Sequence, residues 1–129
     1  MTQRILVLGA GGVGGYFGAR LTEGGADTTF LLRGARREQV AAKGITVHSD
    51  FFDDVSVQVK TVATDEIDQP FDLIVVACKA YQLDAAMDAI APAVGDNTAV
   101  LPLLNGMKQI DVLQARFGAD KVLGGTTYI

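Results

Sequence analysis

The sequence predicts an α/β fold: a doubly wound, mostly parallel sheet with helices on both faces and a short pair of antiparallel or edge strands. Strand-forming runs recur at residues 5–8, 27–32, 73–77 and 98–104, and helical patterns separate them. The run at 73–77 is apolar throughout, as in a parallel strand that is buried on both faces. Apolar and polar residues alternate over 45–62, which is typical of short strands with one exposed face.

Helical spacing and glycine stops define the segments between these strands. The first helix ends at Gly24 and Gly25, and within it Gly14 and Gly18 lie four residues apart. Because a glycine inside a helix costs about 1 kcal/mol relative to alanine, this spacing predicts close packing against the sheet. Further helices are predicted over residues 35–43, 80–91 and 107–117, and another strand begins at residue 122.

A glycine-rich motif joins the first strand to the first helix, and it reads Gly9, Ala10, Gly11, Gly12, Val13, Gly14. The spacing G-x-G-x-x-G in this position is the fingerprint of a dinucleotide-binding turn. Gly9 allows the tight turn, Gly11 lets the backbone approach a pyrophosphate, and Gly14 lets the helix pack on the sheet. Unpaired backbone N–H groups at the helix N-terminus favour an anion there. The alternative is a turn that serves packing alone.

Arg33 follows the second strand, about 20 residues past the glycines, where an NAD-preferring site carries an acid for the ribose hydroxyls. No carboxylate lies between residues 28 and 37. We therefore interpret Arg33, assisted by Arg36 or Arg37, as a clamp for a 2′-phosphate, which predicts NADP(H) as the cofactor. The alternative for each arginine is a solvated loop residue.

Two further polar residues follow predicted strands. Lys79 comes after the strand at 73–77, and Asn105 follows the strand at 98–104. Because ligands bind outside the carboxyl ends of parallel strands, we expect both residues to lie near the glycine turn and Arg33. Lys79 would contact the cofactor or an anionic substrate, and Asn105 would bind a ribose or a substrate. The alternatives are a surface lysine and a structural Asn-Gly turn.

Bulk properties exclude several classes of protein. The 129 residues fit one domain, with 49% apolar and 20% charged residues. A net charge of −4 argues against nucleic-acid binding. No run approaches the ~18 apolar residues of a membrane span, so we expect a cytoplasmic protein without a membrane partner. No metal site is predicted, and His48 and Cys78 are interpreted as structural.

Several motifs together are more specific than the glycine turn. VLGAGGVGG, LLRG at 31–34, CKAYQ at 78–82, LLNGM at 103–107 and GGTT at 124–127 appear in this order. The ordered set resembles ketopantoate reductase, or 2-dehydropantoate 2-reductase, over the whole chain. Members of this family have a Rossmann-like cofactor domain and reduce 2-dehydropantoate to pantoate with NADPH, in pantothenate and coenzyme A biosynthesis.

The resemblance assigns a role to each candidate residue. It implies that Gly9 to Gly14 hold the pyrophosphate, Arg33 the 2′-phosphate, Lys79 the cofactor near the reaction centre, and Asn105 both the nicotinamide ribose and the 2-keto acid substrate. Family members carry a helical C-terminal domain that supplies the general-acid lysine. Residues 1–129 would then be the NADP(H)-binding domain alone, with no catalytic residue of its own and little activity.

Other functions fit the same residues. One is an NADP-dependent hydroxy-acid or sugar-phosphate dehydrogenase with the same two-domain plan. Another is a nucleotide-sensing module like those that regulate potassium transporters, although Arg33 counts against this because such sites carry an acid after the second strand. The oligomeric state stays open, with a homodimer among the options.

Overall fold

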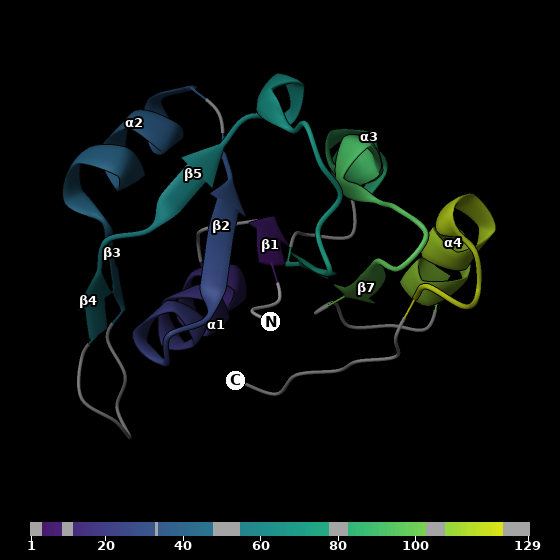
Figure 1. The fold of residues 1–129 in the computed structure, drawn as a ribbon, viewed down its shortest axis with the longest axis horizontal. Coiled ribbons are helices and arrows are strands. Elements are labelled where there is room, and N and C mark those ends of the chain that lie inside the picture. The colour runs from purple at the N-terminus through teal and green to yellow at the C-terminus, as the bar shows by residue number, and fades with distance from the viewer. Residues whose placement is uncertain are drawn as a thin grey trace.

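The computed structural model describes residues 4–8, 12–32, 34–47, 55–77, 83–102 and 108–122 (Figure 1). Strands and helices alternate along most of the chain, as the sequence predicts. The elements are, in order, β1 (Arg4–Leu8), α1 (Gly12–Glu23), β2 (Asp27–Leu31), α2 (Gly34–Lys43), β3 (Ile45–Val47), β4 (Val55–Val57), β5 (Lys60–Val62), the 3-10 turn η1 (Thr64–Glu66), β6 (Leu73–Val76), α3 (Leu83–Ile90), the 3-10 turn η3 (Ala91–Ala93), β7 (Ala99–Pro102) and α4 (Lys108–Phe117).

The main sheet has five strands in the order β5-β2-β1-β6-β7, and every pair is parallel. Its register places Leu8 of β1 opposite Leu31 of β2 and Val76 of β6, while Val76 lies opposite Pro102 of β7. Four strands therefore end level with one another at one edge. The predicted parallel, doubly wound sheet is confirmed.

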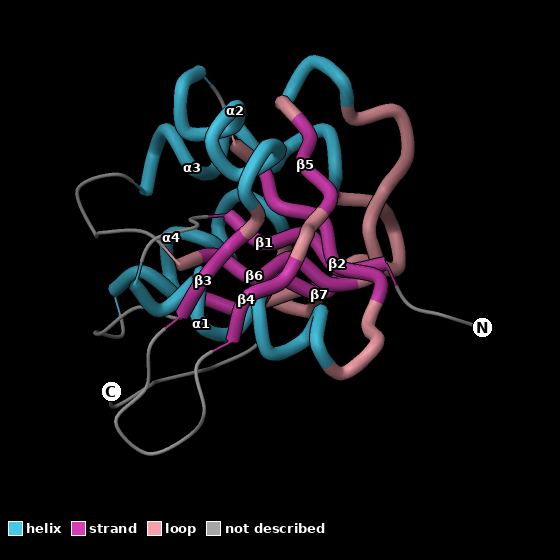
Figure 2. The backbone as a smooth tube through the Cα atoms, turned by 90° about the vertical axis from the view of Figure 1, so that its left-hand side faces the viewer, coloured by secondary structure: helices cyan, strands magenta, loops and turns pink. Residues whose placement is uncertain are grey.

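The two faces of the sheet bury separate cores. On one face, Phe30 and Val7 pack with Ala19 of α1, and all three are fully buried. On the other, Leu6 and Ile74 pack with side chains from α3 and α4, including Ile90 and Leu113. Figure 2 shows the strands in the middle of the molecule with helices outside them. Burial on both faces explains why β6 is apolar throughout and β1 is apolar from Ile5 to Leu8.

Residues 45–62 form three strands, whereas the sequence predicts two. β3 and β4 make the expected antiparallel pair, and both lie against α1. β5 does not pair with β3 or β4, and instead lies parallel to β2 at the edge of the main sheet. The predicted antiparallel pair is confirmed, and the third strand was not predicted because alternation identifies a half-exposed strand without identifying the sheet to which it belongs.

The predicted close packing of the first helix is confirmed at Gly18. A Cβ built on Gly18 would lie 2.1 Å from the nearest atom of the Phe30 ring, which itself has no exposed surface. The absence of a side chain at this position lets α1 pack closely against β2. Gly14 lies four residues earlier in α1, and its surroundings are outside what the structure describes.

Candidate functional site

The carboxyl edge of the main sheet is where the sequence places the site. β2 lies on one side of β1 and β6 on the other, so the chain changes direction across the sheet between these neighbouring strands. In open α/β sheets, ligands bind at such a switch point, outside the carboxyl ends of the strands. The hydrogen bond from Ala77 N–H to the Leu8 carbonyl, 3.0 Å long, keeps β6 aligned with β1 up to this edge.

Each candidate residue follows one of the strands that end at this edge. Gly9 is covalently bonded to the last residue of β1, and Arg33 comes two positions after β2. Lys79 and Asn105 each come three positions after a strand, β6 and β7 respectively. The positions outside the described residues are Gly9, Ala10, Gly11, Arg33, Cys78, Lys79 and Asn105, together with His48 of the strand-pair segment.

The second half of the glycine motif does lie within the described helix. Gly12, Val13 and Gly14 are the first three residues of α1, which begins four positions after β1 ends. Their backbone N–H groups have no partner earlier in the helix, as in any first turn. The first turn of α1 therefore supplies N–H donors and the positive end of a helix dipole beside the switch point, which suits a pyrophosphate.

Arg37 has partners that the sequence did not suggest. It lies near the start of α2, and its Nη2 is 2.5 Å from Oε1 of Glu66 in η1. Its Nε also donates to the Thr61 hydroxyl of β5 at 3.4 Å. Arg37 therefore lies in α2 and pairs with an acid, and a part in binding the 2′-phosphate stays a prediction. Periodicity could not reveal Glu66 as the partner because it lies far along the chain on a different element.

The carboxylate of Glu66 is stabilised in its charged form. Its pKa lies below the ordinary value of a glutamate, mainly because the backbone N–H of Ala63 donates to it, and further because Arg37 donates to it and attracts it. Because its pKa is lower in the folded than in the unfolded chain, the ionised carboxylate stabilises the fold at pH values above the unfolded pKa. This contribution is lost as the pH falls through the folded pKa.

Glu66→Gln is therefore expected to lower the free energy of unfolding at pH 7, where the native carboxylate is charged. The difference from the unmodified chain should begin to shrink as the pH falls below about 4.5, where the carboxyl of the unfolded chain takes up a proton, and it should vanish only below the lowered pKa of the folded state. Urea unfolding at pH 7 and at pH 4 measures this difference. Glu38→Gln, an equal charge change on the exposed surface of α2, is the control. A deficit for Glu66→Gln that is unchanged at pH 4 would contradict the assignment.

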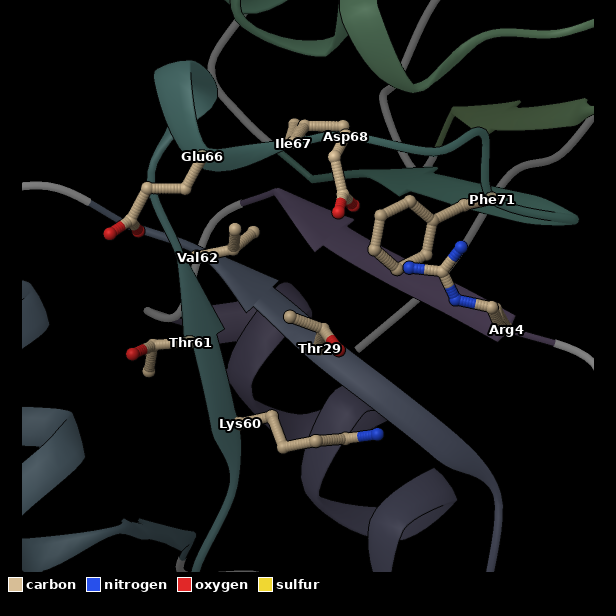
Figure 3. Close-up of a pocket in the computed structure, with 9 residues that line it drawn as sticks. All are labelled: Arg4, Thr29, Lys60, Thr61, Val62, Glu66, Ile67, Asp68 and Phe71. Atoms are coloured by element: carbon tan, nitrogen blue, oxygen red, sulfur yellow. The ribbon is translucent and has the colours of Figure 1, made fainter.

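A shallow groove of about 340 Å³ lies on the sheet face formed by β1, β2 and β5 (Figure 3). Its two cations have partners: the Arg4 guanidinium lies 4.3 Å from the centre of the Phe71 ring, and Lys60 pairs with Asp27. Arg4 begins β1 at the amino end of the sheet, whereas Lys60 begins β5 opposite Thr29, in the middle of β2. From Arg4 the groove extends along β5 to Val62 and Glu66, which lie at and just beyond the carboxyl end of that strand.

The described part of the chain holds neither a metal-binding cluster nor a membrane-spanning helix. No three His, Cys, Asp or Glu side chains there converge as a metal site would require. None of the helices in the described ranges combines the length and the apolar character that crossing a bilayer demands.

An open parallel sheet with a switch point beside β1, and a glycine-rich motif that opens α1, defines a Rossmann-like domain. Comparison with known families identifies it further. The chain matches the model of the family described as "Ketopantoate reductase PanE/ApbA" over residues 5–129. It belongs to that family, as its motifs predict.

Individual relatives agree with this membership. The chain is 40% identical over 127 residues to "Uncharacterized oxidoreductase YkpB" of Bacillus subtilis. The aligned region covers 98% of this chain and 41% of the relative. A crystal structure of 2-dehydropantoate 2-reductase from Geobacter metallireducens has a TM-score of 0.83 and 35% identity, covering 92% of this chain and 39% of that one.

A structure of D-mandelate dehydrogenase with NADH and anilino(oxo)acetate is also similar. Its TM-score is 0.80 and its identity 27%, over 92% of this chain and 39% of that one. The chain thus spans about two fifths of the length of these proteins.

Proposed function

We propose that residues 1–129 form the NADP(H)-binding domain of a cytoplasmic 2-dehydropantoate 2-reductase. The observation that carries this proposal is the level ending of β1, β2, β6 and β7, because the glycine motif, Arg33, Lys79 and Asn105 follow those strands. Four groups suited to a dinucleotide phosphate therefore come from one edge of one sheet. Family membership supports the same conclusion.

The proposal gives each group a separate task. N–H donors of the Gly9–Gly14 turn would hold the pyrophosphate, and the Arg33 guanidinium would bind the 2′-phosphate with charge-assisted hydrogen bonds. Lys79 would contact the cofactor near the reaction centre, and Asn105 would use its amide to orient both the nicotinamide ribose and the substrate. The bound cofactor would supply the hydride for the 2-keto group of 2-dehydropantoate.

The same proposal places the general acid outside residues 1–129. Relatives are about two and a half times as long as this chain, as their 41% coverage implies. A helical C-terminal domain would supply the lysine that protonates the substrate oxygen, together with most contacts to the 2-keto acid. Residues 1–129 alone would bind cofactor and catalyse little.

Calorimetric titration of the chain with NADPH and with NADH tests the cofactor assignment. We expect NADPH to bind about 10- to 150-fold more tightly, the range of a charge-assisted hydrogen bond to one phosphate. NADPH oxidation in the presence of 2-dehydropantoate, measured for the full-length protein and for residues 1–129, tests whether catalysis requires the C-terminal domain. Equal or tighter binding of NADH would contradict the first assignment, and full activity of residues 1–129 would contradict the second.

A second candidate is a 2-hydroxy-acid dehydrogenase of the same two-domain plan. The similarity to D-mandelate dehydrogenase, which was crystallised with NADH, favours it. The two candidates differ in substrate and in the expected cofactor. A full-length protein that reduces aromatic 2-keto acids with NADH, and that leaves 2-dehydropantoate unreduced, would favour the second.

A further inference from the structure

The 3-10 turn η1 contacts two helices, α2 and α3. On one side, the hydroxyl of Thr64 donates to the carbonyl of Ala89 in α3 at 3.1 Å. On the other, the carboxylate of Glu66 pairs with Arg37 of α2 at 2.5 Å. The turn is itself held, because Glu66 also accepts a hydrogen bond from the backbone N–H of Ala63 at 2.9 Å. This short turn therefore links the start of α2 to the last turn of α3.

Arg37 is held from two directions at once. Glu66 lies in η1 and Thr61 in β5, and the guanidinium contacts both. Figure 3 shows the side chains of Glu66 and Thr61 directed to the same side of β5, away from Arg4 and Phe71, and Figure 1 shows α2 beside β5. A planar guanidinium with two partners has little freedom to turn, so the contacts restrict the first turn of α2.

That turn of α2 comes directly after the residue assigned to the 2′-phosphate. Gly34 begins the helix, and Arg33 precedes it by one peptide bond. Any shift in the first turn of α2 thus moves the backbone from which Arg33 extends. Charged hydrogen bonds depend on geometry, so such a shift weakens the contact with a phosphate while leaving the pyrophosphate turn after β1 unchanged.

We propose that Arg37 and Glu66 form a brace that positions Arg33 for the 2′-phosphate of NADP(H). Arg37 is then a positioning residue and not a ligand of the cofactor, because its Nη2 and Nε are engaged by Glu66 and Thr61. This inference rests on the proposed function, in which the chain binds NADP(H) through Arg33. It assigns to Glu66, an acidic residue, a favourable effect on the binding of an anion.

The test compares NADPH and NADH binding in Arg37→Met, Glu66→Gln and the double variant. If the brace acts, each single variant should bind NADPH about two- to fivefold more weakly, the range of an exposed ion pair, with NADH binding unchanged. The double variant should resemble either single one, because both remove the same interaction. A role in general stability alone would change both affinities together and would overturn the proposal.

A direct phosphate contact by Arg37 predicts a different pattern. Arg37→Met would then lose NADPH affinity, while Glu66→Gln would keep or increase it by removing a negative charge and releasing the arginine. That pattern would overturn the brace and leave the proposed function intact. Lys43→Met and Glu38→Gln, which make the same charge changes at exposed positions of α2, are the matched controls and should bind both cofactors normally.

The proposed function fails in a distinguishable way. If the unmodified chain binds NADPH no more tightly than NADH, the cofactor assignment is overturned, and the brace loses its assigned role with it. If the unmodified chain prefers NADPH and neither single variant weakens that preference, only the brace is overturned. Circular dichroism of each variant at the titration temperature verifies that the protein measured is folded.

Discussion

Arg33→Asp is expected to reverse the cofactor preference of this chain. The change removes the guanidinium assigned to the 2′-phosphate and places a carboxylate where an acid would accept hydrogen bonds from the ribose hydroxyls of NADH. NADPH should bind about 10- to 150-fold more weakly from the lost charge-assisted bond alone, and like-charge repulsion adds to that loss. Calorimetric titration with both cofactors measures the ratio of dissociation constants.

The matched control is Lys43→Asp, which makes the same charge reversal in the last turn of α2. It should change NADPH affinity only through the weak, salt-screened field of an exposed charge. If Arg33→Asp retains the preference for NADPH, or if Lys43→Asp loses as much of it, then Arg33 is not the phosphate ligand. Repeating both titrations at higher salt separates a direct contact from a long-range field.

Gly18→Ala is expected to destabilise the fold, although alanine is the better helix former. Helix propensity alone favours the substitution by about 1 kcal/mol. Packing opposes it, because the new Cβ would lie 2.1 Å from the nearest atom of the Phe30 ring, and that ring is fully buried between α1 and the sheet. Overpacking of this kind costs about 1–3 kcal/mol, so the net change should be a loss. Chemical denaturation measures it.

Gly24→Ala is the control for the same chemical change. A Cβ there would have its nearest neighbour at 3.5 Å, an ordinary van der Waals distance, and the residue is exposed. We expect it to be neutral or slightly stabilising. A gain in stability for Gly18→Ala equal to that for Gly24→Ala would show that Phe30 can retreat, and would refute the close packing of α1 on β2.

Local patterns were sufficient for most of the fold because burial leaves a direct trace in composition. The strand β6 is buried on both faces, and its residues Leu73 to Val76 are all apolar. The face of α3 that packs on the sheet carries Leu83, Met87 and Ile90, while Asp84 and Asp88 are exposed. Alternation also revealed short strands in the segment 45–62. It did not reveal that β5 pairs with β2, because strand pairing depends on distant partners.

Some residues of the candidate site could likewise be predicted from the sequence, and others could not. Residues that follow strands could be found from order and spacing, since all parallel strands end at one edge. Arg37 could not be assigned in this way, because its partners Glu66 and Thr61 lie on separate elements and only the folded chain brings them together. The contact of the Arg4 guanidinium with the Phe71 ring likewise joins residues that are far apart in the sequence.

The sequence by itself determined the α/β class, the order of the elements, the glycine motif that opens α1 and the family, because each depends on residue types at fixed short spacing. The tertiary structure alone decided that β5 extends the main sheet, that Phe30 occupies the space left by Gly18, and that Arg37 pairs with Glu66. These three are contacts between elements distant in the chain, and their geometry is set by how the elements pack, which no local pattern encodes.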